Sequence, residues 1–420
     1  MPSIPKILRK EGVFGFIVFL ACCSIIWTVF LSYSLDYQFI PHLALDDDTM
    51  HKTVIYYMLK GENFYSAWRL AAHVTGNLGD LRIYRTPLVF YPVVFLTGWA
   101  GTGFVFPLSV FCVFIAALNL VLTFLTVRTI TGSGWAALAA SFVQYAFFFN
   151  VIPLFQISLF AMPFLILAVY CAWSDRPWLA GLFLALAFLI KETFAFAVPA
   201  ILVFYIMQRK WQSALIVLSI FAGAIGVYFF HTIIAQPIPD PQMMLNASLP
   251  EFFQNLGGFL WFGFGVLAYN VLAPATFDGY YPANPFPPFI PISVFYLILT
   301  LQIILVWGFM ILWVVKHVRN RQWSHLPLIA LAVLLWLIPI LFAASTHLNN
   351  FAMYWMDYAI WRWFAPSYVG FQLLVAMSWT NVRPQLYQWF VTKLSETKIP
   401  IPQIQRSLSI RDVPFDTQAL

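Results

Sequence analysis

Apolar runs recur along the whole chain, and short segments that carry most of the charged residues separate them. A helix of about 20 apolar residues crosses a hydrocarbon core about 30 Å thick. The runs lack the apolar and polar alternation of a membrane β-barrel, so each span is predicted to be a helix that satisfies its own backbone hydrogen bonds. The predicted spans cover residues 13–33, 104–127, 134–151, 154–174, 178–190, 193–208, 212–234, 292–315, 326–344 and 365–380.

Composition supports this fold class, an all-α polytopic membrane protein with about ten transmembrane helices. Hydrophobic residues make up 62% of the 420 residues and charged residues only 9%, whereas an ordinary soluble chain is roughly one quarter charged. The formal net charge of +6 comes from basic residues scattered between apolar runs, which is typical of membrane topology and not of a nucleic-acid-binding face. The four cysteines all lie inside apolar runs, so we interpret them as packing residues.

The distribution of charge predicts which loops face outward. With the N-terminus in the cytoplasm, most of the 22 basic residues fall on the inner side, as the positive-inside rule requires, and most of the 16 acids fall outside. Both termini are therefore expected in the cytoplasm. Residues 1–380 form one transmembrane domain with a short cytoplasmic tail at 381–420. The long exoplasmic segments are predicted at 34–103, 235–291 and 345–364.

Two apolar pieces of these outer segments are too short or too interrupted by glycine to span a bilayer. They are Pro87 to Trp99 and Phe252 to Tyr269. We expect them to be interfacial or re-entrant helices.

The segment after the first span carries three consecutive acids, Asp46, Asp47 and Asp48. Asp48 or Thr49 is predicted to cap a short amphipathic helix on the outer surface, and Gly61 to end it. Acids at this position can simply cap the helix and favour its dipole. Three in a row exceed what capping needs, and their mutual repulsion should raise the pKa of at least one, as a proton acceptor near neutral pH requires.

Several short motifs follow this triplet in a fixed order. They are Met58-Leu59-Lys60-Gly61, Tyr65, Tyr84-Arg85-Thr86-Pro87, Tyr91-Pro92, Lys191-Glu192-Thr193 after a helix of small residues, and the segment RWFAPSYVG that begins at Arg362. Together they resemble the GT-C superfamily of membrane glycosyltransferases, which take a sugar from a polyprenyl-phosphate carrier. The resemblance implies a mannosyltransferase-like or aminoarabinose-transferase-like enzyme, with a bacterial-type inner membrane favoured.

The resemblance also implies that one acid of the triplet is the general base. Aligning the acids on the Met-Leu turn favours Asp47 and Asp48, whereas aligning them on Gly61 favours Asp46, so the choice stays open. The implied partners are a polyprenyl-phosphate-linked sugar, a glycan, lipid or protein acceptor, and membrane lipids, without nucleic acid.

Transfer from a lipid phosphate needs cations that stabilise the departing phosphate. Lys191 and Arg362 are predicted near the outer membrane face, where ionisable residues are costly and therefore functional candidates. Glu192 is either a substrate contact or an ion-pair partner of Lys191. The further substrate-binding candidates are Arg82, Tyr84 and Arg85, although cations in loops are more often solvated.

No resident cofactor is expected, and a divalent ion held by Asp46 to Asp48 with His51 is the alternative. A lone histidine is more often a polar surface residue. Two other functions stay open: a non-catalytic subunit on a transferase-derived scaffold, and a lipid or sugar transporter. A transporter should show charges inside spans or paired broken helices, and Lys191-Glu192 alone fits that description in this sequence.

Overall fold

The computed structural model describes residues 47–74, 86–141, 157–235, 326–344 and 366–380, together with a few isolated helical positions between 250 and 315. Within these ranges every regular element is helical and there are no strands. The elements are α3 (Asp47–Leu59), α4 (Phe64–Val74), α5 (Phe90–Thr97), η2 (Gly98–Gly103), α6 (Val105–Thr131), α8 (Ile157–Trp173), α9 (Pro177–Ile190), η3 (Glu192–Phe196), α10 (Ala197–Met207), α11 (Trp211–Ala235) and α14 (Leu326–Ala344).

Most predicted spans inside the described ranges coincide with a helix. α14 has the predicted bounds, and α6, α8, α9, α10 and α11 begin and end within a few residues of theirs. By length and composition, α6 and α11 are able to cross a membrane, while α8, α9, α10 and α14 form shorter apolar helices. The ten-helix topology thus stays a prediction, because the span at 13–33, most of 292–315 and the tail lie outside the described residues.

Local sequence explains where these helices begin and end. Pro177 occupies the first turn of α9, where its missing N–H would be unpaired in any case. Gly132 ends α6 in the left-handed conformation, with φ of 66°, and its N–H donates to the Arg128 carbonyl at 2.8 Å. Between α9 and η3, Lys191 is extended, with φ of −147° and ψ of 119°, which breaks the helix at the predicted charged pair.

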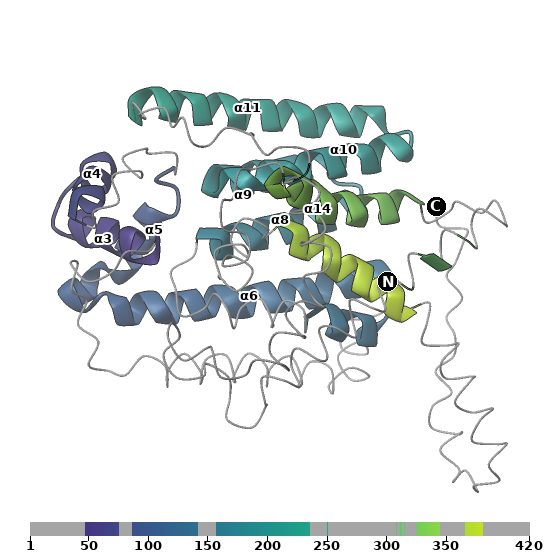
Figure 1. Cartoon of the computed structure of the whole chain (residues 1–420), viewed down its shortest axis with the longest axis horizontal. Helices are drawn as coiled ribbons and strands as arrows, with labels where there is room; N and C mark the ends of the chain where they lie inside the picture. Colours follow the sequence, from purple (N-terminus) through teal and green to yellow (C-terminus); the bar gives the residue numbers. More distant parts are fainter. Residues whose placement is uncertain are drawn as a thin grey trace, which may run out of the picture.

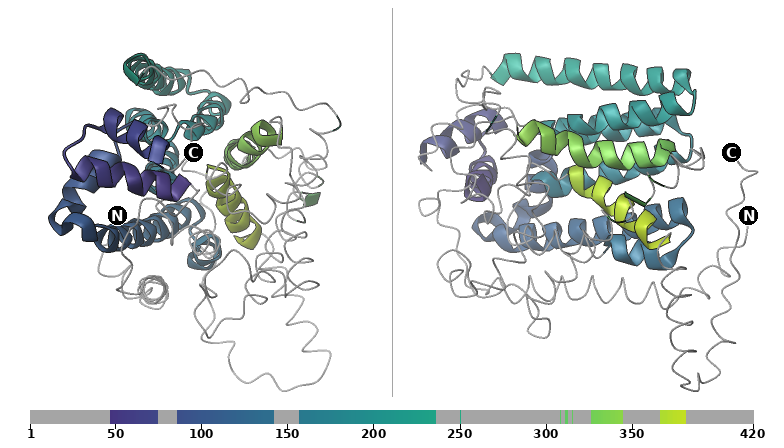
Figure 2. Two further views of the ribbon diagram at one scale, coloured as in Figure 1. Left: turned by 60° about the vertical axis from the view of Figure 1, so that its left-hand side comes forward. Right: turned by 45° about the vertical axis from the view of Figure 1, so that its right-hand side comes forward.

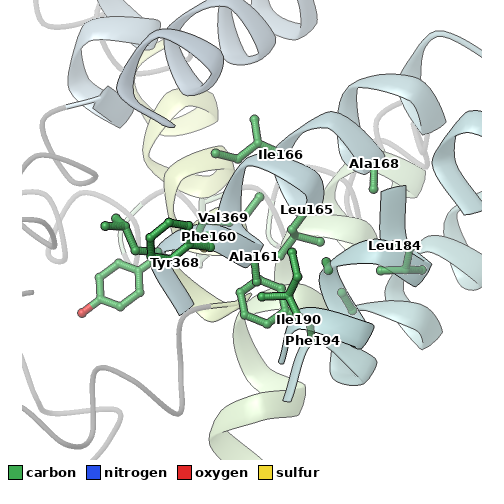
Figure 3. Packing of buried hydrophobic residues seen from close by; sticks show 14 of the residues in the cluster. Phe160, Ala161, Leu165, Ile166, Ala168, Leu184, Ile190, Phe194, Tyr368 and Val369 are labelled. Atoms are coloured by element: carbon green, nitrogen blue, oxygen red, sulfur yellow. The ribbon is translucent and has the colours of Figure 1, made fainter. Parts of the chain in front are cut away.

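The apolar helices pack side by side into a bundle (Figures 1 and 2). α8 packs against α6 and α9, α11 packs against α9 and α10, and α14 packs against α10. Figure 3 shows the part of the core where Phe160 of α8, Ile190 of α9, Phe194 of η3 and Tyr368 of the helix at 366–380 come together. This packing holds the charged break at Lys191 inside the bundle.

The two ends of the bundle differ in their chemistry. At one end, the turns after α8 and α10 are joined by an ion pair of 3.1 Å between Asp175 and Lys210. The helices α3, α4 and α5 lie at the other end, as Figure 1 shows at the left. Arg128 lies in the last turn of α6. Helix α3 and the turn after α10 therefore lie at opposite ends of the bundle.

Among the described glycines, Gly370 makes the closest approach to another helix. A Cβ atom at this position would lie 2.5 Å from the Ala332 carbonyl oxygen and 2.5 Å from the Trp336 backbone nitrogen, both in α14. Backbone atoms cannot move away from an added Cβ atom by changing rotamer, as a side chain can. The helix at 366–380 therefore packs on α14 only with glycine here.

Gly370→Ala is expected to destabilise the protein by about 2 kcal/mol or more, because the two helices must separate to admit one methyl group. Gly223→Ala is the matched control, since a Cβ there meets nothing within 4 Å and alanine favours the helix. The thermal unfolding midpoint in detergent measures both. Equal midpoints for the two variants would show that α14 and residues 366–380 do not pack this closely.

Candidate functional site

Helix α3 begins at Asp47, inside the acidic triplet, and ends at Leu59. Gly61 follows with φ of 97° and ends the helix as predicted. The capping prediction is wrong, because Asp48 and Thr49 lie inside the first turn and not before it. Asp46 lies outside the described residues, while the backbone of Asp47 and Asp48 is described.

The prediction of an amphipathic surface helix is also wrong. All six residues from Met50 to Ile55 are buried, including the polar His51, Lys52 and Thr53, and α3 packs against both α4 and α5. The spacing of apolar residues in the sequence predicted one buried face of α3, but tertiary contacts bury its polar residues as well. α3 is thus an integral part of the fold.

His51 is a buried residue and not the predicted surface residue. Its side chain is 6% exposed, and its ring lies 5.9 Å from that of Trp68 and 5.8 Å from that of Phe90, measured between centroids. Among the described side chains, which exclude those of Asp46 to Asp48, no group of three or more His, Cys, Asp or Glu is placed to hold a metal ion. His51 instead belongs to an aromatic cluster that joins α3, α4 and α5.

Lys191 occupies the break between α9 and η3. Its side chain is 5% exposed, and its ammonium group donates a hydrogen bond of 2.7 Å to the hydroxyl oxygen of Ser158 in α8. A buried ammonium needs such acceptors because leaving water is costly for a charge. The neighbouring Glu192 is half-buried in the first turn of η3. Sequence reasoning identified Lys191 but not Ser158. A single small polar residue in an apolar run does not stand out as a candidate site residue.

Thr86 connects the Tyr-Arg-Thr-Pro motif with this break. Its buried hydroxyl group donates a hydrogen bond to the carbonyl oxygen of Leu189, in the last turn of α9. Such carbonyls have no partner within their own helix. The motif therefore contacts α9 two residues before Lys191. Four other candidates lie outside the described residues: Arg82, Tyr84, Arg85 and Arg362.

A third contact joins α4 to the end of α11. The phenol oxygen of Tyr65 is hydrogen-bonded to Nδ1 of His231 at 3.2 Å, and their rings are stacked with centroids 5.8 Å apart. Burial raises the pKa of the Tyr65 phenol, with Tyr91 as a second cause, so this group stays protonated at neutral pH. Tyr65 was part of the sequence pattern, whereas His231 lay unremarked at the end of a predicted span.

The helices α3, α4 and α5 lie together at one end of the bundle (Figure 1), and the Thr86 hydrogen bond links the segment just before α5 to the end of α9, next to the Lys191 break. Base-assisted transfer from a phosphate ester requires two components. One is a carboxylate, such as those at the start of α3, and the other is a cation, such as the buried ammonium group of Lys191. The structure describes Lys191 in full, and it describes Asp47 and Asp48 by their backbone.

Residues 86–266 match the family model of glycosyltransferase family 87, a GT-C-type family. The match confirms the resemblance to GT-C transferases and implies glycosyltransferase activity. Together with the apolar helices it indicates a membrane protein. The matched range includes Thr86, Lys191 and His231, whereas the acidic triplet lies before it. No curated protein and no solved structure matches the chain.

Proposed function

We propose that this chain moves a sugar from a polyprenyl-phosphate donor to an acceptor at the exoplasmic face of the membrane. The observation that carries the proposal is the family 87 match over residues 86–266, which contains a buried lysine at a helix break. An ammonium group at a helix end inside an apolar bundle suits a ligand with a charged head and an apolar tail. A polyprenyl phosphate has both parts.

One acid of the triplet acts as the general base in this proposal. Asp47 and Asp48 lie in the first turn of α3, and Asp46 directly precedes it. The carboxylate takes the proton of an acceptor hydroxyl, and the acceptor oxygen bonds to the anomeric carbon. The bond from that carbon to the phosphate oxygen breaks, and its electron pair leaves with the phosphate. Direct displacement inverts the anomeric centre.

Lys191 stabilises the negative charge of the donor phosphate, both before and during its departure. In a low-dielectric site one well-placed cation has a much larger effect than in water. Arg362 is proposed as a second cation at the same phosphate. Arg82, Tyr84 and Arg85 supply further substrate contacts, and the hydrogen bond from Thr86 to α9 supports a role for this motif next to Lys191. Glu192 follows Lys191 directly and is the last proposed contact.

The function is tested with the purified protein in lipid nanodiscs. A panel of radiolabelled polyprenyl-phosphate sugars is added with membrane extracts as the acceptor source, and both labelled product and free polyprenyl phosphate are measured. We expect both to form with at least one donor, and neither to form with the variant in which Asp46, Asp47 and Asp48 are all asparagine. Donor movement across a sealed bilayer without chemical change would instead identify a transporter, and an inert protein a non-catalytic subunit.

The orientation of the site is tested by cysteine labelling in intact cells. Glu62→Cys, in the exposed turn after α3, is expected to react with a membrane-impermeant maleimide from outside. Gln212→Cys, exposed at the start of α11 and at the other end of the bundle, is expected to react only after permeabilisation. The reverse pattern would place the acidic triplet in the cytoplasm and remove the exoplasmic site.

A further inference from the structure

The contact between Tyr65 and His231 joins two helices whose residues are 166 positions apart in the sequence. It combines a hydrogen bond of 3.2 Å with a stacked ring pair, so both the distance and the angle between α4 and α11 are restrained. His231 is 6% exposed. Tyr65 is half-buried, and a hydrogen bond in such surroundings is more sensitive to geometry than apolar packing is.

A row of aromatic rings continues from this contact to α9. The Tyr228 ring centroid lies 6.2 Å from that of His231, and the Phe188 ring centroid lies 5.3 Å from that of Tyr228. Phe188 is in the last turn of α9, three positions before Lys191. The ring row therefore runs from α4 across α11 to the helix end that carries the proposed phosphate ligand.

At its other end the ring row reaches the acid-bearing helix. α3 and α4 pack on each other as a hairpin, with His51 of α3 against Trp68 of α4. Tyr65 is in the first turn of α4, and its neighbour Phe64 is fully buried against Trp68 and Phe90. A shift of α4 therefore carries α3 and its first turn with it.

We propose that Tyr65 and His231 are positioning residues, which hold the first turn of α3 at a fixed distance from Lys191. The inference rests on the proposed function, in which the base acts on the acceptor while Lys191 holds the donor phosphate. A base displaced by about 1 Å loses much of its rate advantage, on the order of a hundredfold in sensitive cases. Donor affinity, which depends on Lys191 in this scheme, is unaffected.

Tyr65→Phe removes the hydroxyl group and keeps the ring. We expect kcat to fall about tenfold while KM for the lipid donor stays unchanged. Tyr205→Phe is the matched control, because its buried hydroxyl has no hydrogen-bond partner among the described residues and lies near the opposite turn. This control is expected to keep full kcat.

A second pair of variants replaces the other partner. Asparagine carries a polar atom close to the position of Nδ1, so His231→Asn is expected to retain most of the activity that His231→Leu loses. A purely structural role predicts that leucine, which fills the apolar surroundings, is tolerated at least as well as asparagine. If His231→Asn, His231→Leu and Tyr65→Phe all have the same kcat as one another, the inference is overturned.

A distance measurement tests the same inference without activity. Spin labels at Arg69→Cys on α4 and Leu215→Cys on α11, both exposed, are placed in a background in which the four native cysteines are serine or alanine. We expect a narrow distance distribution, and a broader or shifted one after Tyr65→Phe and His231→Leu. An unchanged distribution in both variants overturns the positioning role, even if the wild-type protein transfers sugar. A changed distribution in a protein without transfer shows that the contact fixes α4 against α11, but it refutes the proposed function and with it the positioning of a base.

Discussion

Replacing the true base among Asp46, Asp47 and Asp48 by asparagine is expected to lower sugar transfer by about 10²–10⁴-fold, the usual contribution of general base catalysis. Asparagine has nearly the same shape as aspartate but cannot take the acceptor proton. The three single variants are assayed for label transferred to product. Their folding is compared with that of the wild-type protein through the thermal unfolding midpoint.

The control for a general effect of charge removal is Asp175→Asn. Asp175 is half exposed and pairs with Lys210 at the opposite end of the bundle, so its loss should cost little stability and no transfer. One severe loss among the three triplet variants identifies the base, a choice that sequence alignment left open. Full activity in all three would show that these acids only stabilise the start of α3 through its dipole.

The sequence predicted the apolar helices because their signal is local. α14 carries the predicted bounds, since polar residues flank a continuous apolar run at both of its ends. The break at Lys191 was likewise predictable, because two adjacent charged residues interrupt an apolar stretch that is otherwise continuous. Both inferences needed only the composition of about 20 consecutive residues.

Features that depend on distant parts of the chain were not predictable in this way. His51 is buried against Trp68 of α4 and Phe90 of α5, although its polar character had suggested an exposed position. The hydrogen bond from Thr86 to Leu189 and the approach of Gly370 to α14 also join segments that no periodicity relates. Among the described residues, sequence therefore identified Lys191, whose burial is costly, and missed its neutral partner Ser158.

Lys191→Met is expected to lower kcat/KM for the lipid donor by about 10²–10³-fold, which is the usual loss when one preorganised charge-stabilising group is removed. Methionine has a similar length and suits an apolar bundle, so the variant is expected to fold. Ser158→Ala removes the acceptor of the Lys191 hydrogen bond but keeps the charge, and it is expected to cause a smaller loss. Lys210→Met, on the opposite turn, is the control and should leave transfer unchanged.

Inhibition by two lipids separates a phosphate site from a purely structural lysine. Polyprenyl phosphate and the corresponding polyprenol share the same tail and differ only in the charged group. If Lys191 binds the phosphate, Lys191→Met weakens inhibition by the phosphate and leaves inhibition by the alcohol unchanged. If Lys191 only ties α9 to α8 through Ser158, the variant alters the shape of the lipid site, and both inhibitors lose affinity to the same extent. Equal losses, or unchanged inhibition by the phosphate, would therefore exclude Lys191 as the phosphate ligand.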